Sequence, residues 1–364
     1  MILSTLPASV DAFTPEIMTQ LVQQLHPQAV VERFDIIKAL QYGEGMVSTA
    51  ARAILEFHYK AGTGEGLPTR VILKLAYDLE ELPSPLYVNE VNFYHHLRSE
   101  MTIETPVTLG AHYDAESRHF ALLLEDLTER SANFPNALSP LALTEVEAVL
   151  DNLAKLHAKY WQSPRFAGDL DWLETHVSGD LADFMNKAVP HVIQQEIDTN
   201  CFKHELVAKM NSSGDELLQG LLAVQLHQST LPQTLLHGDT HVGNVYMLPD
   251  GPGLLDWQLM VRGYCMHDVN YLITTALPVN LRREHEQGLL QGYLSQLSAY
   301  GVARPPSFDE AWREYRRTLI WGVYIGWLTT NVANYGWEIQ AVNLVRLTTA
   351  FDDLDTMVLV KELL

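Results

Sequence analysis

The spacing of apolar residues predicts a β-rich first third of the chain. An apolar period of two, or a short continuous apolar run between turn residues, is typical of a strand. Runs of this kind cover residues 30–40, 51–59, 69–75, 107–113 and 119–124. Two helices are expected among them. One covers residues 84–98, and the other starts with Thr14 as N-cap and Pro15 at the first helical position.

From about residue 128 the apolar spacing becomes helical. Residues 143–160 carry apolar side chains at intervals of three and four, and similar patterns dominate the remainder. The longest apolar run, Leu319 to Leu328, is too short to span a bilayer and predicts a buried helix. The fold class is therefore expected to be α+β, with one unit at 1–127 and a larger helical unit at 128–364.

One stretch inside the helical part has another character. Residues 235–259 predict a strand, a polar loop, and two short strands joined by the turn Pro249-Asp250-Gly251. If these two strands pair, Asp256 lies close to Asp239 and Asn244. Two carboxylates and an amide side by side suit Mg²⁺ binding and proton transfer.

Charge narrows the classes of partner. The chain has 364 residues, with 24 basic against 45 acidic ones and a net charge of −21. Such a field repels nucleic acid and anionic membranes, so neither is expected as a partner. A nucleotide would need a metal and a few local cations. Two cysteines, Cys201 and Cys265, and an N-terminus without a signal-peptide pattern favour a soluble cytoplasmic protein.

The β-rich part carries residues suited to holding phosphates. Phosphoryl transfer depends on charge neutralisation and positioning more than on covalent chemistry. Lys74, within an apolar strand, would hold the α- and β-phosphates, and Glu90 on the next helix would fix Lys74. Ser48 follows the turn Gly43-x-Gly45 and would donate to a phosphate. The plainer interpretations are a lysine that faces solvent and an ordinary hairpin turn.

The polar loop carries the residues suited to the transfer itself. Asp239 would orient an attacking hydroxyl and accept its proton. Asn244 and Asp256 would hold Mg²⁺, which prefers hard oxygen ligands. His237 would support the loop by hydrogen bonding.

These motifs, in this order, resemble those of the protein-kinase-like fold. The stretch His237–Asn244 is similar to the His-Gly-Asp-x-x-x-x-Asn motif of the aminoglycoside and choline phosphotransferase superfamily, and Leu255-Asp256-Trp257 to its second motif. Gln258, directly after the aspartate and the aromatic residue, resembles the ecdysteroid-kinase-like branch. Unlike a protein kinase, the chain has a shorter Gly-rich turn.

The resemblance implies a fold of two lobes, with ATP and Mg²⁺ as cofactors. A small β-rich lobe would bind the nucleotide, and a larger α-helical lobe would carry catalysis and substrate binding. The backbone of Glu125 and Leu127 would bind adenine at a hinge. Asp268 would brace the catalytic loop. The implied activity is transfer of the γ-phosphoryl group of ATP to a hydroxyl of a small molecule.

Two other functions remain open from the residues alone. His237, Asp239 and His241 form a His-x-Asp-x-His pattern that would suit a zinc-dependent hydrolase. A catalytically inactive pseudokinase would share the fold and act as a binding module. The aromatic residues Trp321, Tyr324 and Trp327 are expected mainly in the core, although such a face would suit an apolar hydroxylated acceptor.

Overall fold

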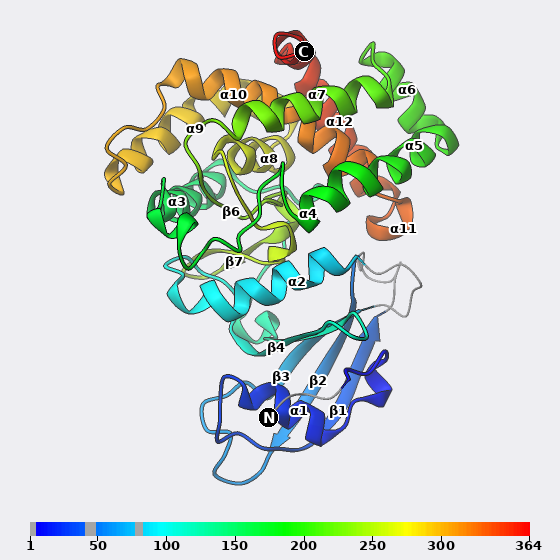
Figure 1. Cartoon of the computed structure of the whole chain (residues 1–364), viewed down its shortest axis with the longest axis vertical. Coiled ribbons are helices and arrows are strands. Elements are labelled where there is room, and N and C mark those ends of the chain that lie inside the picture. The colour runs from blue at the N-terminus through cyan, green and yellow to red at the C-terminus, as the bar shows by residue number, and fades with distance from the viewer. Residues whose placement is uncertain (1–4, 41–48, 77–82) are drawn as a thin grey trace. The chain divides into compact units, whose positions relative to one another are not determined.

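The computed structural model describes residues 5–40, 49–76 and 83–364, and the chain divides into two compact units (Figure 1). The N-terminal unit comprises Met1–Asn133 and Val332–Gly336, and the C-terminal unit comprises Phe134–Asn331 and Trp337–Leu364. The Gly-rich turn and Ser48 lie outside the described residues. The predicted assignment of nucleotide binding to one unit and catalysis to the other stays a prediction.

The N-terminal unit is built on one antiparallel sheet in the order β1-β2-β3-β5-β4. Its strands are β1 (Val31–Leu40), β2 (Ala51–Tyr59), β3 (Arg70–Leu75), β4 (Thr108–Asp114) and β5 (His119–Glu125). All five predicted runs are therefore strands, within one residue at each end. The residues between β4 and β5 form a hairpin connection.

Helices cover the two faces of this sheet. On one face, alternate residues of β2 such as Leu55 and Phe57 join a core with α1 (Pro15–Gln23), whose N-cap Thr14 accepts from the Ile17 N–H at 3.4 Å. The other face packs against α2 (Ser84–Asn92), where Tyr87 stacks on Phe120 of β5 at 4.2 Å. Because side chains alternate along a strand, Lys74 of β3 points to the α2 face.

The predicted helix at 84–98 has a more complex form. After α2 the chain continues as a π-helix, η2 (Phe93–Leu97), and a 3₁₀ turn, η3 (Arg98–Glu100). A second short 3₁₀ helix, η4 (Leu127–Arg130), follows β5, and another, η1 (Val10–Ala12), precedes α1.

The C-terminal unit is predominantly helical (Figure 1). Its α-helices are α3 (Leu143–Tyr160), α4 (Asp180–Asp183), α5 (Val189–Thr199), α6 (Cys201–Lys209), α7 (Gly214–Gln228), α8 (Met266–Ala276), α9 (Val279–Ala299), α10 (Phe308–Trp321), α12 (Trp337–Asp353) and α13 (Thr356–Lys361). Shorter helical turns are η5 (Pro164–Ala167), η6 (Phe184–Ala188), η7 (Val242–Asn244), η8 (Trp257–Leu259) and η9 (Gly322–Leu328), and α11 (Val332–Tyr335) belongs to the N-terminal unit. The predicted α+β class, with a β-rich unit and a larger helical unit, is confirmed.

Helix α8 lies at the centre of this unit. All of its residues are buried, and α3, α9, α10 and α12 pack around it. The apolar run Leu319–Leu328 forms the end of α10 and the π-helix η9 and is buried except for Gly326, as predicted for a helix of the core. No described helix has both the length and the apolar character needed to cross a bilayer.

Candidate active site

The polar loop is held between two small strand pairs of the C-terminal unit. β6 (Thr234–Leu236) leads into His237 and pairs with β9 (Val261–Gly263). β7 (Val245–Leu248) and β8 (Gly251–Leu254) form the predicted hairpin, which is confirmed. The Leu255 N–H then donates to the Asn244 carbonyl oxygen at 3.0 Å. The next residue, Asp256, is thereby brought to the loop.

Asp268, in the first turn of α8, fixes the backbone of the loop. Its carboxylate accepts from the N–H groups of His237 at 2.8 Å and Gly238 at 2.9 Å. Burial alone would raise the pKa of Asp268, but the hydrogen bond with His157 at 3.1 Å and the neighbouring histidines hold that pKa below its usual value. Asp268 is thus a buried anion that braces the loop, as the resemblance implied.

Gly238 lets the loop turn tightly against the segment that follows Asp256. Its φ is +83°, and a Cβ atom there would collide with the carbonyl oxygen of Leu259. Only glycine combines this conformation with such a close approach. The Gly238 carbonyl accepts from Nε2 of His267 at 2.9 Å, so both sides of this peptide are fixed.

His237 supports the loop through both ring nitrogens. Nε2 donates to the Leu255 carbonyl oxygen at 3.0 Å, and Nδ1 accepts from the Asp239 N–H at 3.2 Å. Neither nitrogen is left for a metal ion. Among the described residues, no group of three or more His, Cys, Asp or Glu side chains is arranged to hold a metal. The geometry therefore does not favour the zinc hydrolase.

Asp239 is the carboxylate at the centre of the loop. Its side chain is 14% exposed. Asn244 Nδ2 donates both to Oδ2 at 3.0 Å and to the Asp239 carbonyl oxygen at 2.8 Å. Burial, and then the charge of Asp256, raise the pKa of Asp239 to about 8, with the Asn244 hydrogen bond acting in the opposite direction.

Asp256 and Asn244 are the candidate metal ligands. Both are buried, and Asp256 has a φ of +67°, an uncommon conformation for a residue other than glycine. The Nδ2 atom of Asn244 is engaged by Asp239, which leaves Oδ1 as the atom for a metal. This donor set of carboxylate and amide oxygens fits Mg²⁺, and a divalent cation would relieve the repulsion between Asp239 and Asp256.

Lys74, the residue predicted to hold phosphates, and Glu90 form a buried ion pair in the N-terminal unit. Lys74 Nζ lies 2.7 Å from both carboxylate oxygens of Glu90 on α2, and the residues are 5% and 1% exposed. The solvent-facing lysine is therefore ruled out, and the expected pairing is confirmed. The contact of Lys74 with a nucleotide stays a prediction.

The predicted hinge has an irregular hydrogen-bond pattern at Glu125. Val107 directly precedes β4, whose register pairs Thr108 with Leu124, and the Glu125 N–H donates to the Val107 carbonyl oxygen at 2.9 Å. The Val107 N–H, however, donates to the Glu125 side chain at 2.8 Å instead of to its backbone carbonyl. Arg130 Nη1 holds the same side-chain oxygen at 3.1 Å.

The Val107 N–H is thus taken by the Glu125 side chain and not by the Glu125 carbonyl oxygen. Leu127 is the first residue of η4, where N–H groups have no acceptor within the helix. One carbonyl and one N–H two residues apart would suit the amino group and the ring nitrogen of adenine. The nucleotide-binding roles of Glu125 and Leu127 stay predictions.

Sequence reasoning missed several residues that the structure places around these groups. His157 on α3 and His267 on α8 join the buried network of the loop, and Arg130 orients Glu125. A small cavity beside the loop, lined in part by Gln225 and Trp321, was not expected. The roles of these residues depend on contacts between distant segments, which local spacing does not encode.

Comparison with solved structures shows the class of fold. The chain is similar to choline kinase from Cryptosporidium parvum Iowa II, with a TM-score of 0.56, 11% identity, and coverage of 89% of this chain and 90% of that one. For Plasmodium vivax ethanolamine kinase the TM-score is 0.51 and the identity 13%, and the match covers 88% of this chain and 83% of that one. For the GDP complex of aminoglycoside 2'-phosphotransferase-IIIa the TM-score is 0.51 and the identity 8%, and the match covers 94% of this chain and 99% of that one. The chain thus has the two-lobed protein-kinase-like fold.

The family profile is more specific. The Ecdysteroid kinase-like family matches residues 42–301, most of the chain, and the chain belongs to that family. The match covers the loop at His237–Asn244, the Asp256 segment and Lys74. A comparison with curated protein sequences finds no match.

Proposed function

We propose that this protein is a small-molecule kinase that, with Mg²⁺, transfers the γ-phosphoryl group of ATP to a hydroxyl of its acceptor. The observation that carries the proposal is the loop at Asp239, where the buried Asn244 and Asp256 converge on the Asp239 carboxylate. The family and the fold support the same function, since choline kinase, ethanolamine kinase and aminoglycoside 2'-phosphotransferase-IIIa share the fold.

Each residue of the loop has a distinct role in the proposed phosphoryl transfer. Asp239 orients the acceptor hydroxyl and takes its proton as the bond to phosphorus forms. Asn244, through Oδ1, and Asp256 are the groups that would hold Mg²⁺. The cation would neutralise the phosphate oxygens when bound. Asp268 and His237 keep the loop backbone in one conformation, so the carboxylate needs little rearrangement before reaction.

The N-terminal unit supplies the groups proposed to hold the nucleotide. Lys74 is a fixed cation in a chain of net charge −21, which suits it to the α- and β-phosphates. The Glu125 carbonyl and the Leu127 N–H would bind adenine. The aminoglycoside 2'-phosphotransferase-IIIa structure contains GDP, which supports a purine nucleotide here. The free thiols of Cys201 and Cys265 fit the reducing cytoplasm, where ATP is abundant.

The test is replacement of Asp239 by its amide. Asp239→Asn keeps the shape of the side chain and removes the proton acceptor, so ADP formation with an acceptor should fall by about 10²–10⁴-fold. The melting temperature should stay close to that of the wild type. Asp250→Asn, at the exposed turn of the same hairpin, is the matched control and should retain full activity.

Two outcomes would contradict the proposal. Near wild-type turnover by Asp239→Asn would remove its assigned role. ATP binding by the wild type, with no ADP formed against any hydroxylated acceptor, would favour the pseudokinase instead. The acceptor screen includes sterols, hydroxy acids, amino alcohols and aminoglycosides.

A further inference from the structure

A larger pocket lies in the C-terminal unit, where α10 packs beside the end of α7 and the segment before α8 (Figure 1). Its volume is about 550 Å³, within the range of about 300–1,000 Å³ that small-molecule sites occupy. Its polar lining includes Tyr264, Arg304 and Arg313, and its apolar lining includes Leu231 and Pro305. We name this cavity the second pocket.

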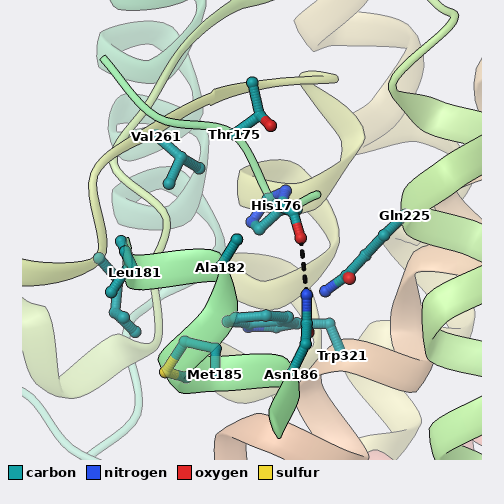
Figure 2. A pocket seen from close by; sticks show the side chains of 10 residues that line it. Thr175, His176, Leu181, Ala182, Met185, Asn186, Gln225, Val261 and Trp321 are labelled. Atoms are coloured by element: carbon teal, nitrogen blue, oxygen red, sulfur yellow. Dashed lines mark hydrogen bonds between the residues drawn. The ribbon is translucent and has the colours of Figure 1, made fainter. Parts of the chain in front are cut away.

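The second pocket is distinct from the other sites of the C-terminal unit. It shares no lining residue with the cavity at Gln225 and Trp321, whose volume of about 10 Å³ leaves room for roughly one water (Figure 2). Asp239, Asn244 and Asp256 do not line it either. A ligand bound in the second pocket would therefore not occupy the candidate active site.

Two arginines of the second pocket have no partner among the described residues. Arg304 precedes α10 and Arg313 lies on it, and both are exposed. Neither forms a hydrogen bond, an ion pair or a ring contact within the part of the chain that the structure describes. Every other arginine of the chain has an interaction partner. Two unpaired guanidinium groups at one pocket are thus an exception in a chain of net charge −21.

The hydroxyl of Tyr264 is a further donor at this pocket. Tyr264 is 3% exposed, and its side chain forms no hydrogen bond with any described residue. The hydroxyl is not sealed inside the protein, so the small exposed part of the side chain includes it. Burial is the main cause that raises the pKa of Tyr264, so the hydroxyl stays protonated at physiological pH.

The acidic residues of the second pocket are mostly engaged by the protein itself. Glu314 accepts from Nη1 of Arg317 at 2.7 Å. Glu310 belongs to the capping box of α10, where its carboxylate accepts from the N–H and Oγ of Ser307 at 2.9 and 2.7 Å. Asp309 is exposed and is the remaining acid of the lining. The two unpaired arginines outweigh this single carboxylate, so the pocket favours an anion.

A phosphate monoester matches these groups. Guanidinium groups bind phosphate oxygens through paired hydrogen bonds, and a phosphate monoester carries close to two negative charges, enough for two arginines. The Tyr264 hydroxyl can donate to a further oxygen. Leu231, Pro232 and Pro305 provide an apolar wall for the organic part of the ligand. A cationic ligand would be repelled by the same two arginines.

We propose that the second pocket is a binding site for a small phosphate monoester with an apolar body. Arg304 and Arg313 bind the phosphate group, Tyr264 donates to it, and the apolar wall contacts the rest of the ligand. The site goes beyond the proposed kinase function, because none of these residues takes part in the phosphoryl transfer. Binding at the second pocket is therefore measurable without any turnover.

The test is binding of phenyl phosphate to the whole chain, measured by isothermal titration calorimetry with EDTA at low ionic strength. EDTA removes divalent cations, so the phosphate is not drawn to the proposed magnesium site. The wild type should bind phenyl phosphate about tenfold more tightly than benzyl alcohol or benzylamine, the neutral and cationic probes. Benzoate, which carries a single charge, should bind with an intermediate Kd.

Substitutions then locate the bound phosphate. The double variant Arg304→Gln, Arg313→Gln removes both guanidinium groups and should raise the Kd for phenyl phosphate at least about tenfold. Its melting temperature should stay close to that of the wild type, because both side chains are exposed and unpaired in the described structure. Tyr264→Phe should raise the Kd about fivefold. Arg283→Gln, at an exposed arginine of the same unit, is the matched control and should leave the Kd unchanged.

Three outcomes would overturn the inference. The first is the absence of saturable phenyl phosphate binding by the wild type. The second is an equal Kd in the wild type and the double arginine variant, which would place the phosphate elsewhere in the chain. The third is tighter binding of benzoate, benzyl alcohol or benzylamine, which would contradict the phosphate class. None of the three bears on the proposed kinase function, which the activity of Asp239→Asn tests.

Discussion

Single residues of unusual backbone conformation shape the candidate site. Gly238 has a φ of +83° and Asp256 a φ of +67°, and they belong to the two motifs that meet at the loop. A strained backbone conformation of this kind persists where several surrounding contacts hold it in place. At Gly238 those surroundings are the hydrogen bonds to Asp268 and His267.

Gly238→Ala should therefore destabilise the fold more than the addition of a single methyl group suggests. The added Cβ would collide with the Leu259 carbonyl oxygen, and alanine disfavours positive φ, so we expect a loss of about 3 kcal/mol in the free energy of unfolding. Gly288→Ala, on an exposed part of α9 with open space around its Cα, should instead stabilise by about 0.5–1 kcal/mol. Chemical denaturation measures both. Equal effects of the two substitutions on the free energy of unfolding would contradict the close approach of Gly238 to the Leu259 carbonyl oxygen.

At the scale of residues, the sequence predicted which polar side chains of the loop lie together better than it predicted the residues around them. Asp239 and Asn244 share a short polar loop, and a recognisable turn brings Asp256 to them, so local spacing sufficed. Gln225 could not be found this way. Its position opposite Asn186 depends on how α7 packs against η6, and no periodic pattern encodes that contact.

At the scale of elements, the end of β5 departs from regular strand pairing at Glu125. The Glu125 side chain takes the N–H of Val107 that a regular ladder would give to the Glu125 backbone carbonyl. Arg130, which also pairs with Glu104 at 2.6 Å, holds that side chain in place. The Glu125 side chain thereby replaces the Glu125 carbonyl oxygen as the acceptor for Val107.

Position 125 offers a sharp test of this arrangement. In Glu125→Leu the Val107 N–H can return to the backbone carbonyl, which then competes with adenine, so the KM for ATP should rise about tenfold. Glu125→Gln retains a side-chain acceptor and should change that KM by less than about threefold. Steady-state kinetics with saturating acceptor distinguishes the two variants. An equal KM for ATP in the two variants would show that the Glu125 side chain does not influence nucleotide binding.

The strands were predictable because their period of two is short and local. All five runs of the N-terminal unit are strands, and residues 143–160 form α3 as predicted. The helix expected at 84–98 was less regular. There the π-helix η2 widens the turn between α2 and η3, and burial of Phe93, Tyr94 and Leu97 decides its path. Tertiary packing overrides the helical period at this point.

At the scale of the whole molecule, the negative charge predicts a requirement for metal. The net charge is −21, and the charge of Asp256 raises the pKa of Asp239, so we expect a nucleotide to need a divalent cation to bind productively. Chelation by EDTA should abolish ADP formation, and added Mg²⁺ should restore it. The melting temperature of the nucleotide-free protein should not change. Activity that survives EDTA, or stoichiometric zinc in the purified protein, would contradict the magnesium site.

The C-terminal helices carry none of the proposed catalytic, metal-binding or nucleotide-binding residues, yet they complete the core. The buried Arg346 of α12 donates to the carbonyl oxygens of Thr275, in α8, and Ala137. α10 and α12 both pack against α8, which carries Asp268.

The family match ends at residue 301, before these helices begin. A recombinant fragment cut at that boundary would uncover the apolar faces of α8, and such surfaces promote aggregation. Expression boundaries for this protein are therefore best drawn from the packing around α8 and extended through α13.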